Sequence, residues 1–139
     1  TYTLLDGVEV FILDNAGATV DISFYESMAG GTPSNLIYSE TGFAAVRGWN
    51  RFLFSTPQSF PAASERGIIV KVMNAGSSFS LVIDASGTPS GRSYFDQDGI
   101  GAYAALCATP FCGDLNIVGL LGSAGPPPPP VVIFGDSFE

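Results

Sequence analysis

Short segments with an apolar residue at every second position recur along this chain, and they constrain its fold more than any other feature. In residues 19–25, Val20, Ile22 and Phe24 alternate with polar or aromatic side chains. Successive side chains of a β-strand point to opposite faces, so this two-residue period predicts a strand. Almost nothing in the sequence follows the 3.6-residue period of a helix. The chain is therefore expected to be all-β.

Similar segments follow one another at intervals of about ten residues, separated by turns rich in Gly, Pro and Asn. We expect strands at residues 8–13, 19–25, 36–39, 49–55, 67–73, 79–84, 92–95 and 115–121. Residues 74–77 should form the turn of a hairpin between residues 67–73 and 79–84, and residues 61–66 form at most one helical turn. Many short strands at this spacing predict an antiparallel β-sandwich, jelly-roll-like in form.

A proline run divides the expected sandwich, residues 1–122, from a short apolar tail. The linker, residues 123–130, ends in five prolines, which favour a stiff polyproline II rod of roughly 15 Å. The tail, residues 131–139, is expected to form an extension strand. Its predicted subunit-contact residues are Val131, Val132, Ile133, Phe134 and Phe138.

The energetics of the tail favour docking into a prepared groove. Burying a Val, Ile or Phe side chain stabilises by roughly 1.5–3 kcal/mol, whereas ordering each residue costs roughly 1–2 kcal/mol. The gain from burial and the cost of ordering therefore nearly cancel. Docking becomes favourable when the tail fills a prepared groove, such as a sandwich that lacks a strand. Donation to a neighbouring copy would build an open head-to-tail fibre. Docking of the tail on its own domain, and a role as a sorting or export signal, are the alternatives.

Thirteen acidic and five basic residues give the chain a net charge of −8. The bases form no run or patch, whereas phosphate binding needs clustered Lys and Arg. We therefore expect no binding to nucleic acid or to an anionic membrane surface. No apolar run reaches the roughly twenty residues that cross a bilayer, so no membrane insertion is expected. Charged residues are only 13% of the chain, which leaves apolar surface available for contact with copies of itself.

The two cysteines, Cys107 and Cys112, lie close together in the sequence. The chain has neither a histidine nor a third thiol, so a metal site there is implausible. A disulfide is the preferred interpretation, and two buried free thiols are the alternative. A disulfide indicates an oxidising, extracellular compartment. The Thr1 start also fits export through a removed signal peptide, although a longer chain cut at an arbitrary position could begin in the same way.

Few residues in this sequence are candidates for catalysis or metal binding. Without histidine, the Ser, Thr and Cys side chains lack their usual activating base, so we expect no catalytic residues and no enzyme. Asp96 and Asp98, followed by Gly99, match the opening of a calcium loop, and Asp84 or Asp114 would have to complete it. The other ligands do not follow in the sequence. A tight polar turn is thus favoured over a calcium site, and no cofactor is expected.

Aromatic side chains offer one further binding chemistry, because flat rings stack on sugars. Trp49 with Tyr94 is the candidate glycan platform, and Tyr25, Tyr38 and Tyr103 are further candidates. In a sandwich, however, a lone Trp at the start of a strand is more often a core residue. The sequence therefore favours a buried Trp49.

Several structural positions between Val20 and Gly99 recur in a known kind of module. They are the strand 20–25, the Gly-Gly-Thr-Pro loop 30–33, Gly48-Trp49, Thr56-Pro57 before Phe60, the apolar strand 68–72, and Gly91-Arg92-Ser93-Tyr94-Phe95 with Asp98-Gly99. In these positions the chain resembles the β-sandwich modules attached to bacterial secreted peptidases and surface proteins. The resemblance implies a fold rather than a chemistry.

One departure from that resemblance, and a second resemblance at the C-terminus, bear on assembly. Such modules usually carry another strand ahead of the one at residues 8–13, and here only residues 1–5 precede it. The ending, residues 133–139, is similar to the short Asp-Gly-Phe-Glu tails of some secreted bacterial proteins, with Ser137 in place of the usual Gly. We therefore predict a secreted or cell-surface structural subunit that polymerises through its C-terminal strand. A carbohydrate- or surface-binding module of a larger secreted protein is the alternative.

Overall fold

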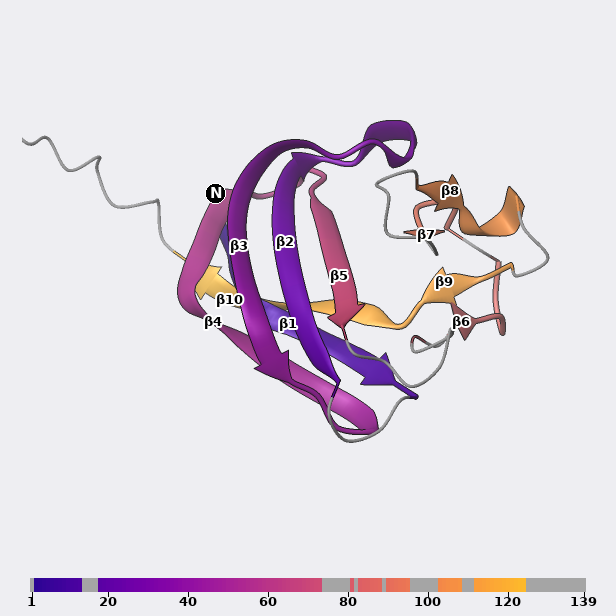
Figure 1. Cartoon of the computed structure of the whole chain (residues 1–139). Helices are drawn as coiled ribbons and strands as arrows, with labels where there is room; N and C mark the ends of the chain where they lie inside the picture. The colour runs from indigo at the N-terminus through magenta and orange to yellow at the C-terminus, as the bar shows by residue number, and fades with distance from the viewer. Residues whose placement is uncertain are drawn as a thin grey trace, which may run out of the picture.

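Two antiparallel sheets pack face to face in the computed structural model (Figure 1), which confirms the predicted β-sandwich. The structure describes residues 2–13, 18–73, 81, 83–88, 90–95, 103–108 and 112–124. Sheet A has the strand order β10 (Ile117–Ala124), β1 (Tyr2–Ile12), β4 (Gly48–Pro61). Sheet B has the order β3 (Ser34–Ala44), β2 (Thr19–Ser27), β5 (Gly67–Met73). Residues 123 and 124, the start of the expected linker 123–130, belong to β10, and the rest of the linker and the tail, residues 125–139, lie outside the described residues.

The core lies between the two sheets and follows the two-residue period of the sequence. On β2 the buried side chains include Val20, Ile22 and Phe24, as the alternation predicts. On the facing strands of sheet A the buried apolar side chains are Leu5, Val8, Val10, Ile12, Phe52 and Phe54. Each strand thus contributes one face to a shared apolar layer, which is the arrangement of an aligned sandwich.

Strand β1 is longer than the expected strand at residues 8–13. The residues ahead of that expected strand belong to the same element and form no separate strand. Strand β1 runs from Tyr2 through Ile12 as one element, with a register shift between Leu5 and Gly7 against both neighbours. A Cβ on Gly7 would lie 2.1 Å from the Phe52 carbonyl oxygen. Only glycine lets the backbones approach this closely, so the bulge joins two halves that appear separate in the sequence.

Sheets A and B are joined along the β3 and β4 edges, which we call the closed side. Opposite the β1 bulge, residues 54–57 of β4 leave the regular pairing with β1. Ser55 donates its backbone N–H and its hydroxyl to the Glu40 carboxylate of β3 (2.9 and 2.5 Å). The Thr56 N–H points to the Tyr38 hydroxyl at 3.4 Å, and Pro57 has no N–H. Side chains of β3 thus replace the lost backbone partners.

Strand β3 also extends beyond its predicted span, residues 36–39. Gly42, beyond that span, lies inside the strand with φ of 78°, next to a register shift against β2. Its N–H donates to the Asp21 carboxylate at 2.9 Å. A glycine in this conformation marks a β-bulge, so the strand bends at this point and continues.

Beside the sandwich lies a peripheral layer of short elements (Figure 1). Strand β6 (Ile83–Asp84) pairs with β9 (Asp114–Leu115), and β7 (Tyr94–Phe95) pairs with β8 (Ala104–Ala105). Two 3₁₀ turns, η1 (Ala29–Gly31) and η2 (Leu106–Ala108), complete the layer. A Cβ on Gly31 would lie 2.8 Å from the Tyr94 ring, so η1 fits closely against β7.

Two predicted elements of this region are wrong. Residues 67–73 do not form a hairpin with residues 79–84 where these are described: β5 pairs with β2, Leu81 bridges to Ile12, and β6 pairs with β9. The expected strand 115–121 is divided at Asn116, whose carbonyl accepts a hydrogen bond from the Phe11 N–H at 3.2 Å. Pairing partners distant in the sequence decide both features.

Candidate functional site

The sandwich has an open side opposite the closed one, along β5 and β10. Among the described residues, β5 pairs only with β2, and β10 pairs only with β1. The two strands face each other across the core, because a Cβ on Gly119 would lie 3.8 Å from Ile68 Cδ1. Each therefore presents one edge of backbone N–H and C=O groups, which is a template for a further strand.

Apolar side chains also line this open side. Ile68, Val70 and Val72 pack against the core but are only partly buried. Leu121 is 64% exposed, although it pairs in register with the buried Leu5. Natural edge strands are usually protected by charges or prolines, yet β10 has neither in its eight residues. We define the open side by these four residues and Gly119.

The outer face of sheet A is a second unusual surface, with apolar side chains around an ion pair. Trp49 is 54% exposed and meets Phe11 edge to face, with ring centroids 5.4 Å apart. One row along, Arg51 contacts Glu9 at 2.9 Å. Val118, in register with Glu9, and Leu53 are also exposed. The name "outer face of sheet A" is used below for these six residues.

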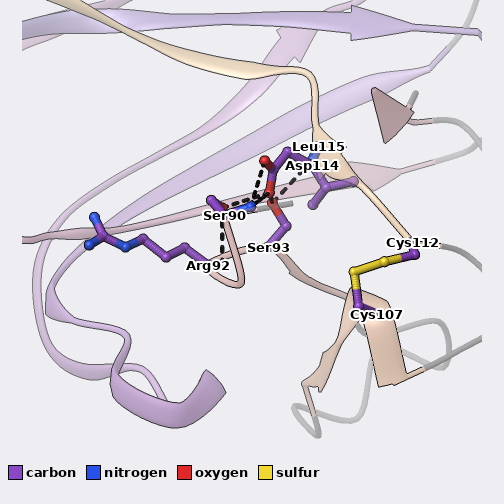
Figure 2. Close-up of a disulfide and its surroundings, with 7 residues drawn as sticks. All are labelled: Ser90, Arg92, Ser93, Cys107, Cys112, Asp114 and Leu115. Carbon is purple, nitrogen blue, oxygen red and sulfur yellow. Dashed lines mark hydrogen bonds between the residues drawn. A yellow bond between two sulfur atoms is a disulfide. The ribbon is translucent and has the colours of Figure 1, made fainter. Parts of the chain in front are cut away.

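A hydrogen-bond cluster around Asp114 occupies the peripheral layer (Figure 2). Ser90 donates its hydroxyl to Asp114 Oδ1 at 2.6 Å and its backbone N–H to Oδ2 at 3.0 Å. Ser93 donates its hydroxyl at 3.0 Å and accepts from the Leu115 N–H at 3.2 Å. Hydrogen bonds from Ser90 hold the pKa of Asp114 below its ordinary value. Through the Asp114 carboxylate, Ser90 and Ser93 thus tie their loop to β9.

The Cys107–Cys112 disulfide is present beside this cluster (Figure 2), as predicted. Cys107 belongs to η2, and Cys112 lies just before β9. Gly113, between Cys112 and Asp114, is buried, and a Cβ there would lie 2.5 Å from the Asp84 carbonyl oxygen. The disulfide and this close contact fix the path that brings Asp114 to its serines.

The predicted aromatic residues lie in different parts of the fold. Trp49 is exposed on β4, so the expectation that it is a core residue is wrong. Tyr94 is partly buried in β7 against Gly31. Tyr38 packs on Phe54 at the closed side, with centroids 5.0 Å apart. The ring that contacts Trp49 is Phe11, which sequence reasoning did not select.

The calcium candidates Asp96 and Asp98 lie outside the described residues, as does Gly99. Asp84 and Asp114, proposed to complete such a site, face each other in the pairing of β6 with β9. Each accepts hydrogen bonds from nearby serines. Within the part of the chain that the structure describes, no group of three or more His, Cys, Asp or Glu side chains is placed to hold a metal ion.

The predicted subunit-contact residues, Val131 to Phe134 and Phe138, also lie outside the described residues. What the structure adds is a candidate acceptor for them, the open side, which sequence reasoning missed. Within the described ranges, no helix is long and apolar enough to span a membrane. No protein-family model, no curated protein and no solved structure matches this chain.

Proposed function

We propose that this protein is a secreted or cell-surface structural subunit that assembles by placing its C-terminal strand, residues 131–139, on the open side of a neighbouring copy. The observation that supports this proposal is the coincidence of two open strand edges with partly exposed core residues. Strand addition to such an edge gains backbone hydrogen bonds along its length. The side chains Val131 to Phe134 supply the apolar groups to cover Ile68, Val70 and Leu121.

The linker favours a neighbouring copy over the same molecule. Strand β10 ends at Ala124, and residues 126–130 are all proline. To pair with β10 of its own domain, the tail would have to reverse direction within this run. Consecutive prolines prefer an extended rod of roughly 15 Å and resist such a reversal. Contact between an edge of one copy and the tail of the next is heterologous, and it builds an open fibre when the rotation between copies does not close.

Deleting residues 131–139 tests the donor. Negative-stain microscopy and sedimentation velocity should show fibres for the full chain and monomers or small oligomers for the truncated chain. Fibres of unchanged length after truncation would rule out this mechanism.

The variant Leu121→Asp tests the acceptor, because it places a charge on the open side at a position already exposed in the fold. We expect it to shorten or abolish the fibres. Leu36→Asp is the matched control: Leu36 is similarly exposed, at 57%, but lies on β3 of sheet B, and its variant should assemble normally. If both variants assemble like the unmodified chain, the tail docks elsewhere.

A further inference from the structure

The outer face of sheet A combines residue types that are usually found inside protein interfaces. Trp49, Leu53 and Val118 are exposed there, and Phe11 lies against Trp49. Monomeric proteins rarely expose contiguous apolar patches of large area, and aromatic residues and Arg are enriched at interface cores. This face is separate from the open side, because inner and outer side chains alternate along β1 and β4.

The register between β1 and β4 places complementary residues side by side on this face. Phe11 pairs with Trp49, Glu9 pairs with Arg51, and two residues further along Gly7 pairs with Leu53. Each row therefore contains one residue from β1 and a complementary one from β4. The rows are an aromatic pair, an acid with a base, and a glycine opposite a large aliphatic side chain.

We propose that the outer face of sheet A binds the same face of a second copy about a two-fold axis that runs parallel to the strands, between β1 and β4. This axis places the β1 residue of each row over the β4 residue of the other copy. Glu9 of one copy then meets Arg51 of the other, and Phe11 meets Trp49. Such a self-complementary patch defines an isologous dimer.

Charge favours a second copy over other partners. The Glu9–Arg51 pair leaves the face with no net charge of its own, so it has no attraction for a strongly acidic or basic ligand. In the dimer, two such pairs form one ring of alternating charges. The repulsion between two bodies of net charge −8 is largely screened beyond about 8 Å at physiological ionic strength. The contact uses none of residues 131–139 and is independent of the proposed fibre.

A charge exchange provides the sharpest test. All chains carry Ile133→Asp and Phe134→Asp, so that tail docking does not obscure the result. In this background, Glu9→Arg places Arg opposite Arg in a homodimer, and Arg51→Glu places Glu opposite Glu. Mixed together, the two variants form only opposite-charge contacts. Sedimentation equilibrium should show a dimer for the parent, at least about tenfold weaker association for each variant alone, and restored association for the mixture.

Trp49→Ala tests the apolar part of the same contact. Buried Trp residues are frequent hot spots, so we expect the dimer Kd to rise at least about tenfold, while Leu36→Ala on sheet B leaves it unchanged. Thermal unfolding identifies any variant that does not fold. A parent that stays monomeric up to millimolar concentration would overturn the proposal, and so would a mixture that associates no better than its parts. Saturable glycan binding by a monomer, lost in Trp49→Ala, would assign the face to a sugar instead.

Discussion

The closed and open sides of the sandwich differ in whether the backbone groups at their strand edges have hydrogen-bond partners within the described residues. On the closed side β4 leaves its regular pairing over residues 54–57, and Glu40 and Tyr38 of β3 supply new hydrogen-bond partners. On the open side, the described parts of β5 and β10 have no such partners along one edge. Side-chain hydrogen bonds within the chain thus hold β3 against β4 on the closed side, whereas an exposed edge stays available to another chain. This contrast is the reason for proposing that another chain adds a strand to the open side and not to the closed one.

Truncating one apolar side chain on each side should give the largest difference in stability. Phe54 is 6% exposed and contacts Tyr38, so Phe54→Ala should lower the free energy of unfolding by about 3–5 kcal/mol. In the chain without residues 131–139, Leu121→Ala, on the exposed edge, should change it by less than about 0.5 kcal/mol. Urea unfolding of both variants measures the difference.

The same pair of variants also shows whether the open side is truly free. If Leu121→Ala proves costly in the full chain but not after deletion of residues 131–139, a tail covers this edge: the tail of a neighbouring copy where the full chain is assembled, and its own tail where the full chain is monomeric. If it is costly in both chains, another part of the domain covers that edge.

A smaller effect is expected from the carboxylate that holds the closed side. Glu40→Gln exchanges an ionised acceptor of three hydrogen bonds, from Ser55 and Tyr38, for a neutral amide. Hydrogen bonds to charged groups are worth about 1.5–3 kcal/mol, and the amide retains part of them, so we expect a loss of about 1–2 kcal/mol. Glu26→Gln is the control, because exposed Glu26 accepts from the Asn35 side chain at the surface. Equal losses in both variants would show that Glu40 has no special role.

The sequence predicted the parts of the fold that depend on local pattern. The inward face of β2 followed from Val20, Ile22 and Phe24. The exposure of Trp49 was also predictable, since Phe52 and Phe54 occupy the opposite phase of the same strand and only one face of β4 meets the core. The preference for a buried lone Trp came from a general expectation for sandwiches, and it outweighed this local signal.

The features that distinguish the two sides depend on contacts distant in sequence. In the sequence, Gly42 is a residue type that commonly ends a strand, and only the pairing of β3 with β2 shows that it marks a bulge. Glu40 has no recognisable motif, because its role comes from the unpaired residues of β4 beside it. The open edges follow from strand order, which no segment of the sequence specifies alone. The positions of strands along the sequence were therefore more predictable than which strands lie next to one another.

Acid should weaken the closed side. Hydrogen bonds from Ser55, and then from Tyr38, hold the pKa of Glu40 below its ordinary value of 4.5. The folded state thus binds this proton less readily than the unfolded chain, so the contribution of Glu40 is fully present above the unfolded pKa and is lost as pH falls through the folded one. Unfolding free energies measured from neutral pH to about pH 3 should fall more steeply for the unmodified chain than for Glu40→Gln.

The pKa values of Asp84 and Asp114 are also lowered, by serine hydrogen bonds, and the unmodified chain and the Glu40→Gln variant both retain that contribution. Parallel curves would therefore place the acid sensitivity in the peripheral layer and show that an ionised Glu40 does not hold β3 against β4.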